Sequence, residues 1–207
     1  ANITIGIPLS KQEIPIRTSG NICVKAPVFP FIKLRGLDPA PGPEMKSTGE
    51  VFGSDDSADL AYLKARLATE VPVASSGGAY LTVRDQDKKN LLDSANKLTE
   101  LGFTLYATPG TADFLRENKI PVEIVYRIRE TKHPDALDLM RQGKISFIVN
   151  VPTVSGGAVR DGNMMRRLAV ELNIPFVTTI RGANMEVSAI AAQQKGNLEP
   201  RRLRVNY

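Results

Sequence analysis

A Thr-Pro-Gly-Thr turn from Thr108 to Thr111 is the part of this sequence best suited to bind an anion. The apolar stretch 103–107 before the turn indicates a short strand, and a helical pattern opens at Thr111 with Asp113 in its first turn. Two hydroxyl groups, Gly110 and free backbone N–H groups would then gather at the positive end of a helix, where phosphate binds readily. The alternative is a loop without ligand binding, in which the threonines only cap the helix.

Alternating strand and helix patterns across residues 79–195 must position this turn. Five strand–helix units in series predict an α/β fold with a doubly wound five-stranded parallel sheet. A glycine-bearing loop is expected at 152–162. Strands are predicted at 79–84, 103–107, 122–128, 145–151 and 175–179, and helices at 87–101, 111–118, 134–141, 163–172 and 182–194.

Ligands of such sheets bind beyond the carboxyl ends of the strands. The residues at those ends are hydroxyl, amide and cationic groups, without a cysteine, a metal-ligand cluster or an acidic pair. This set favours binding of a phosphorylated small molecule and is poorly suited to acid–base catalysis, so we assign no catalytic residue and no metal ligand. The residues are Thr108, Thr111, Arg127, Asn150, Thr178 and Thr179.

Residues 1–70 differ in character from the rest. A strand with proline interruptions is predicted at 22–31, a turn-rich loop at 37–50 and a helix at 57–71. One strand and one helix leave too much apolar surface uncovered to form a core alone. We therefore expect an incomplete tail of a larger domain, joined by a linker at 71–78 to the domain at 79–195 and followed by a basic tail at 196–207.

Composition restricts the class of protein further. The hydrophobic fraction of 42% and charged fraction of 24% are those of a globular protein, and neither a membrane span nor a signal peptide is expected. The net charge of +5 favours anionic ligands, but no aromatic residues are interleaved with the basic ones as a nucleic-acid surface requires. The single cysteine, Cys23, is predicted to be a buried strand residue in a cytoplasmic protein.

Two stretches resemble one known family. PVFPFIKLRGLDPAPGPEMKSTGEVFG at 27–53 resembles the end of the second ATP-grasp half of the carbamoyl-phosphate synthase large subunit, and its GPEMKSTGEV core is long and unusual. Residues 79–195 resemble the methylglyoxal-synthase-like domain that follows there. The resemblance implies the regulatory C-terminal portion of an ATP-dependent ligase of pyrimidine and arginine biosynthesis, inactive as a synthase by itself.

The resemblance also implies cofactors and partners. The ATP, Mg or Mn, and K ligands of the family lie upstream of this piece, so no cofactor is expected in this chain. The expected partners are the remaining ATP-grasp part of the large subunit and the glutaminase small subunit, in an oligomer, with no membrane or nucleic acid.

In that family this domain binds allosteric effectors, in many bacterial members uridine or inosine monophosphate. Matched by position, the residues that bind the effector phosphate in that family correspond to Lys88, Thr108, Gly110, Thr111 and Arg127. The residues on the ribose and base side correspond to positions near Asn150, the loop Ser155 to Asp161, and Thr178 and Thr179. Position 127 is commonly lysine in nucleotide-regulated members, and arginine keeps that charge. Members regulated by N-acetylglutamate tend to carry an aromatic residue there.

Two other interpretations stay open. A free-standing methylglyoxal synthase shares the fold, but its Gly-Gly-Asp motif is missing from 127–138. Asp135 and Asp138 are nearby carboxylates there, but Asp135 is expected as a cap in the first turn of a helix, and His133 is expected as a loop residue. The domain could also be an assembly element without a ligand. Of the remaining cations, Lys88 could simply be solvated, and Arg166 and Arg167 are expected on a solvated or interfacial face outside the pocket.

Overall fold

The structure is a computed structural model that describes residues 2–12, 21–31, 33, 38–40, 42–130, 132–152, 157–196 and 198–200. In chain order its elements are η1 (Leu9–Lys11), β1 (Ile22–Val28), β2 (Gly49–Asp55), α1 (Ala58–Leu67), β3 (Gly78–Thr82), η2 (Asp85–Asp87), α2 (Lys88–Glu100), β4 (Thr104–Ala107), α3 (Pro109–Glu117), β5 (Glu123–Ile124), η3 (Ile128–Glu130), α4 (Ala136–Arg141), β6 (Ile145–Asn150), α5 (Gly157–Glu171), β7 (Phe176–Val177) and α6 (Ile180–Gln194).

A five-stranded sheet in the order β5-β4-β3-β6-β7 forms the centre of the molecule, and every neighbouring pair is parallel. One hydrophobic cluster joins the sheet to α2, α3 and α6, and a second joins it to α4 and α5. Helices therefore cover both faces, and the predicted doubly wound five-stranded parallel sheet is confirmed. Strand β6 lies inside the sheet and is buried along nearly its whole length, as its apolar sequence predicts.

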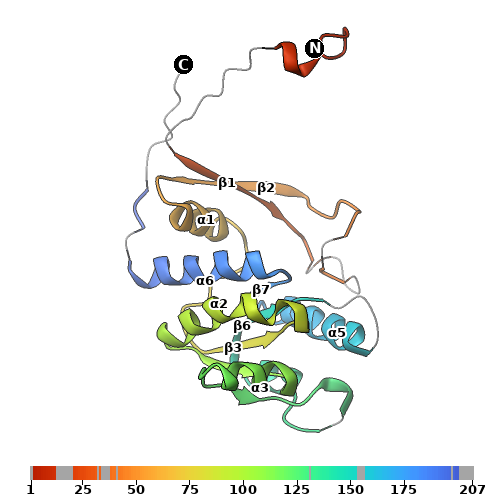
Figure 1. Cartoon of the computed structure of the whole chain (residues 1–207), viewed down its shortest axis with the longest axis vertical. Coiled ribbons are helices and arrows are strands. Elements are labelled where there is room, and N and C mark those ends of the chain that lie inside the picture. Colours follow the sequence, from red (N-terminus) through yellow and green to blue (C-terminus); the bar gives the residue numbers. More distant parts are fainter. Residues whose placement is uncertain are drawn as a thin grey trace.

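A second, smaller layer lies beyond α6, on the face of the sheet that this helix covers (Figure 1). Strands β1 and β2 pair antiparallel, with Ile22 opposite Asp55, and α1 packs between them and α6. Backbone contact is close at Gly53 in β2, because a Cβ atom there would lie 2.1 Å from the carbonyl oxygen of Ala61 in α1. The strand β2 was not predicted: the sequence around it, rich in glycine and charge, gives a weak strand pattern.

Cys23 is exposed, so the prediction of a buried cysteine is wrong. The two-stranded sheet packs α1 on one face only, and side chains alternate between the two faces of a strand. Val24 lies on the more buried side of β1, which leaves Cys23 on the other. Its thiol lies 3.7 Å from the Ser54 hydroxyl.

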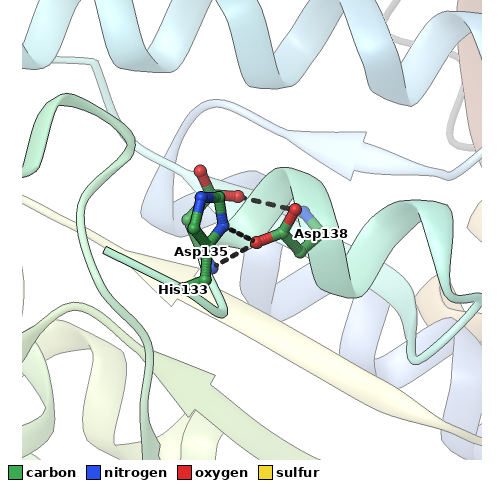
Figure 2. A group of neighbouring side chains, drawn as sticks. All are labelled: His133, Asp135 and Asp138. Carbon is green, nitrogen blue, oxygen red and sulfur yellow. Dashed lines mark hydrogen bonds and ion pairs between the residues drawn. The ribbon is translucent and has the colours of Figure 1, made fainter. Parts of the chain in front are cut away.

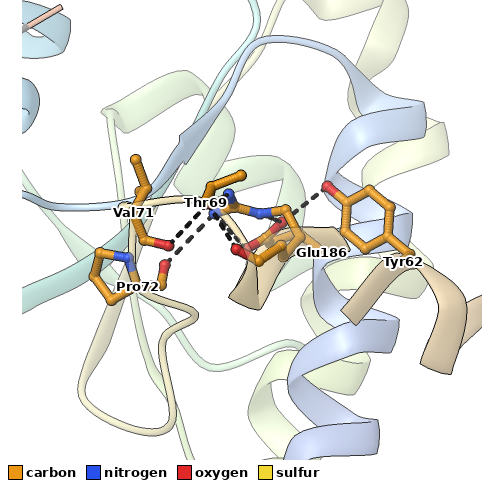
Figure 3. A network of polar contacts seen from close by, with 6 residues as sticks. Tyr62, Thr69, Val71, Pro72 and Glu186 are labelled. Atoms are coloured by element: carbon orange, nitrogen blue, oxygen red, sulfur yellow. Dashed lines mark hydrogen bonds and ion pairs between the residues drawn. The ribbon is translucent and has the colours of Figure 1, made fainter. Parts of the chain in front are cut away.

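A buried polar network joins the small layer to the large domain (Figure 3). Glu186 of α6 is 1% exposed and accepts hydrogen bonds from Arg66 Nε at 2.8 Å, Arg66 Nη2 at 3.2 Å and the Tyr62 hydroxyl at 2.9 Å. Burial, and next the Glu186 carboxylate, raise the pKa of Tyr62. Burial alone would lower the pKa of Arg66, but Glu186 raises it above the ordinary value. Charge pairing therefore fixes α1 on α6.

Several element boundaries differ from the prediction. Helix α3 begins at Pro109, two residues earlier than expected, because proline suits the first helical position. Strands β5 and β7 have only two residues each, as edge strands with one neighbour. Helix α5 already begins at Gly157, inside the predicted loop, where its glycines serve close packing: a Cβ at Gly157 would lie 2.8 Å from Arg129 Nη1.

Candidate functional site

A cavity of about 410 Å³ opens at the carboxyl ends of β3 and β6. Thr82 and Asn150, the last residues of these two strands, both line it. The start of α3 reaches it through Thr108, whose side chain makes no capping hydrogen bond, and α5 contributes Asp161 and Gly162. Its place is the one where open α/β sheets bind ligands, and its volume is in the range of small-molecule sites.

Cations dominate the rim of this cavity. Arg84, Arg127 and Arg129 all line it. Arg84 is held by Asp87, with 2.6 Å between Nε and Oδ2. Arg127 is held loosely, because its Nη1 lies 3.7 Å from Glu130 Oε1 and the pair is partly exposed. An incoming anion can therefore displace the weak contact of Arg127 more easily than that of Arg84.

Two carboxylates, Asp85 and Asp161, also line the cavity. Burial raises the pKa of Asp161 above its ordinary value, although Arg129 and Arg127 oppose the shift. The pKa is raised because the carboxylate is partly removed from water, and the nearby cations do not fully offset this effect. Such a group can accept hydrogen bonds from neutral hydroxyl donors of a ligand.

Four of the residues singled out in the sequence come together in this cavity: Thr108, Arg127, Asn150 and Asp161. Others lie beside it. Thr178 and Thr179 line a second hollow of about 310 Å³, which shares Arg84 and Val151 with the first. The Thr179 hydroxyl accepts from the Gly182 N–H at 3.0 Å and so caps α6. Ser155 lies outside the described residues.

Lys88, Gly110 and Thr111 do not line the cavity. Lys88 Nζ donates to the Gly110 carbonyl oxygen at 2.6 Å and lies 2.7 Å from Asp85 Oδ1, so its charge lies beside the first turn of α3. Thr111 is 2% exposed and is a third-position residue within α3. The two hydroxyls of the predicted anion site are therefore separated, because the helix begins earlier and Thr111 lies on its buried side, while Thr108 stays at the cavity.

Sequence reasoning missed Arg84, Arg129 and Gly162 as cavity residues. Arg84 could have been found, because it follows the end of β3 just as the other candidates follow their strands. The chain bends at η3, where Arg129 is located, and no sequence pattern indicated that turn.

The prediction that Arg166 lies on a solvated or interfacial face is wrong. It is 2% exposed, and its Nη1 donates to Oδ1 of Asn150 at 2.5 Å. Its Nε and Nη2 donate to the two carboxylate oxygens of Asp38 at 2.9 and 2.5 Å. Its neighbour Arg167 is exposed as expected. Helical spacing places Arg166 on the same face as the buried Met165 and Ala169, but its charge can be buried there only because partners from distant parts of the chain pair with it.

His133, Asp135 and Asp138 bring ligand-type atoms within 4.8 Å of one another (Figure 2). These groups already serve the start of α4. Asp135 Oδ1 accepts from the Asp138 N–H and Asp138 Oδ2 from the Asp135 N–H, each at 3.0 Å, and His133 Nδ1 lies 2.5 Å from Asp138 Oδ2. The predicted capping role of Asp135 is confirmed, and the structure shows that Asp138 completes a capping box with it. Neither carboxylate lines the cavity.

Hydrogen bonding to Asp138, and next its charge, raise the pKa of His133. The hydrogen bond from His133 is in turn the main cause that lowers the pKa of Asp138. The histidine ring is 71% exposed, so this pair is a surface contact of the helix start.

None of the helices in the described part of the chain has the length and apolar character that a membrane crossing requires.

Comparisons with known proteins match residues 90–178 to the MGS-like domain family. The chain is 49% identical over 188 residues to "Carbamoyl phosphate synthase large chain, C-terminal section" of Methanocaldococcus jannaschii, which covers 90% of this chain and 30% of that protein. It is 44% identical to the protein of the same description from Methanopyrus kandleri, over 89% of this chain and 34% of the relative. It is 40% identical to the carbamoyl phosphate synthase large chain of Methanothermobacter thermautotrophicus, over 86% of this chain and 16% of the relative. The chain thus spans about a third or less of the length of these relatives.

Proposed function

The chain carries an MGS-like domain and is similar over most of its length to the C-terminal section of carbamoyl phosphate synthase large chains, and from that premise we propose that its cavity binds a nucleoside monophosphate that regulates such an enzyme. The observation that carries the proposal is the composition of the cavity: Arg127, Arg129 and Thr108 meet Asp161 and Asn150 in about 410 Å³. Cationic groups, a hydroxyl, an amide and a carboxylate that line one cavity suit a ligand with a phosphate and a sugar.

The phosphate end of the proposed site is formed by Arg127, Arg129 and the start of α3. Arg127 exchanges its loose contact with Glu130 for a bidentate contact with phosphate oxygens. Thr108 offers its hydroxyl at the positive end of α3. Lys88, held on the Gly110 carbonyl oxygen, adds positive charge beside the same turn.

The sugar and base end is formed by Asp161, Asn150 and the second hollow. The Asp161 carboxylate accepts hydrogen bonds from ribose hydroxyls, which are neutral donors. The hollow lined by Thr178 and Thr179 adjoins the cavity at Arg84 and gives the base room. Asn150, the Thr178 hydroxyl and nearby backbone groups offer it hydrogen bonds.

The regulatory action would be a shift of population. A ligand that binds one state of the whole large chain more tightly than another moves the equilibrium between them. We propose that the partner of this chain is the remaining ATP-grasp part, which holds ATP and its metal ions, together with a glutaminase subunit, in a cytoplasmic oligomer. The exposed outer side of β1 and β2, with Phe52, is where that part would continue the small layer.

Calorimetric titration of the 207-residue chain tests the proposal. The ligands are uridine monophosphate, inosine monophosphate, uridine, N-acetylglutamate and dihydroxyacetone phosphate. We expect one nucleoside monophosphate to bind, and uridine to bind at least about tenfold more weakly than its monophosphate, since charged hydrogen bonds to phosphate are lost. Binding of dihydroxyacetone phosphate with turnover would favour a lyase instead. If no phosphorylated ligand binds, the proposal fails and an assembly role becomes the better interpretation.

The chain alone should form no carbamoyl phosphate from bicarbonate, ammonia and ATP. Formation above the rate of a no-protein control would contradict the division of labour proposed here.

A further inference from the structure

One buried guanidinium joins the cavity to the N-terminal layer. Arg166 of α5 donates a hydrogen bond from Nη1 to Asn150, which lines the cavity. Its Nε and Nη2 donate to Asp38, which lies eleven residues before the first residue of β2. Only 3% of the Arg166 side chain and 31% of that of Asp38 are exposed. Contacts of this kind, with two parallel N–H···O bonds to one carboxylate, fix the orientation of the guanidinium.

The chemistry of arginine then dictates the orientation of Asn150. A guanidinium has only donors, so the asparagine atom that faces Nη1 must be the carbonyl oxygen Oδ1. The amide group Nδ2 lies on the other branch of the same planar side chain. Arg166 thus forbids the flipped amide, in which Asn150 would offer the cavity an acceptor.

The backbone of α5 is shaped around this contact. A Cβ atom at Gly162 would lie 2.8 Å from Arg166 Nη1 and 3.2 Å from Asn150 Oδ1. Glycine within a helix is less stabilising than alanine, but here it makes room for the guanidinium beside the cavity. Asp38 has further support: it accepts from the Ala40 N–H at 3.0 Å, and its pKa is lowered because Arg166, Ala40 and Asn163 together outweigh the effect of burial.

We infer that Arg166 is a positioning residue for ligand recognition: held by Asp38, it keeps Asn150 as a hydrogen-bond donor toward the cavity. Recognition in the cavity then depends on the N-terminal layer being docked, although Asp38 does not line the cavity. By reciprocity, a ligand that uses the Asn150 amide strengthens the docking of the Asp38 segment by the same factor. The ligand part of this inference rests on the proposed function; the orientation of Asn150 does not.

The test replaces Asp38 in the whole chain. In Asp38→Asn the paired hydrogen bonds from Arg166 Nε and Nη2 to the carboxylate are lost. The affinity for uridine monophosphate should then fall about tenfold, the equivalent of one hydrogen bond. In an Asn150→Ala background the same substitution should change the affinity less than about twofold, because the effect is exerted through Asn150. The matched control is Asp55→Asn, which breaks another ion pair of the N-terminal layer, that of Asp55 with Lys64, and should leave the affinity unchanged.

A ligand-free measurement separates this inference from the proposed function. The side-chain amide signals of Asn150 in ¹⁵N–¹H spectra should shift or broaden in Asp38→Asn and stay in place in Asp55→Asn. Unchanged Asn150 signals would overturn the inference whether or not a nucleotide binds. Equal losses of affinity in the wild-type and Asn150→Ala backgrounds would also overturn it, since they indicate a general structural effect. Spectra that respond as expected in a chain that binds no nucleotide would sink the proposed function alone.

Discussion

Arg127 and Arg166 show how differently two arginines of one sequence are used. Arg127 follows a strand and lines the cavity, and its Nη1 lies 3.7 Å from Glu130 Oε1. Arg166 lies in the middle of α5, is buried, and donates hydrogen bonds to Asp38 and Asn150. The position of Arg127 at a strand end could be predicted from the sequence. The burial of Arg166 could not, because a carboxylate more than a hundred residues away compensates its charge.

Arg127→Met tests the phosphate end of the proposed site. Methionine keeps the apolar length of the side chain and removes the charge, so the affinity for uridine monophosphate should fall by about 1.5–3 kcal/mol, or roughly tenfold to over a hundredfold. Calorimetric titration measures the change. Arg167→Met, the same replacement on an exposed face of α5, is the matched control and should bind as the wild type does. Equal affinity of the Arg127 and Arg167 variants would exclude Arg127 from the site.

At the scale of elements, the central units were predictable, and so were β1 and α1 of the small layer, whereas β2 was not. The helical spacing of Leu91, Ala95 and Leu98 gave α2 its buried face, and all three are fully buried. In β2 the inward positions are taken by Gly53 and Asp55, which carry no hydrophobic signal. The glycine there is explained only by the helix α1 that lies against it.

Gly53→Ala tests that close packing. The added Cβ would meet the Ala61 carbonyl oxygen at 2.1 Å and the Ala65 backbone nitrogen at 2.5 Å, so α1 must move away from β2. We expect a loss of about 1–3 kcal/mol in the free energy of unfolding, typical of overpacking, measured by urea denaturation. Gly49→Ala in the same strand, where nothing lies within 4 Å of the new Cβ, should change stability by less than about 0.5 kcal/mol. A similar loss in both variants would mean that strand propensity, and not packing, sets the cost.

At the scale of the whole molecule, ion pairs among the described residues join the N-terminal layer to the sheet domain. They include Arg66 with Glu186 between α1 and α6, where Figure 3 labels Glu186, and Asp38 with Arg166. The apolar core also continues across this boundary, since Leu63 of α1 and Val73 belong to the same cluster as the helices of the sheet. The two parts therefore share one apolar cluster and are joined by ion pairs, as the coupling proposed above requires.

Glu186→Gln tests the first bridge. It leaves the Arg66 guanidinium buried without its carboxylate, and loss of one partner of a buried ion pair costs about 3–5 kcal/mol. Urea denaturation should show that loss in the free energy of unfolding. Glu50→Gln, which breaks the exposed pair of Glu50 with Lys25, should cost no more than about 1 kcal/mol. A cost for Glu186→Gln as small as that of Glu50→Gln would mean that water or other donors replace the bridge.

The sequence by itself determined the parallel sheet and predicted that Thr108, Arg127 and Asn150 gather at the carboxyl ends of its strands, where they do line one cavity. These predictions follow from local periodicity and from the topology that strand–helix alternation imposes, whereas Asp161 was a candidate through the family resemblance alone. The tertiary structure alone decided that Thr111 is buried, that Cys23 is exposed, and that Arg166 links Asn150 to Asp38. The burial of a polar group depends on which distant partner compensates it, and local sequence carries no information on that partner.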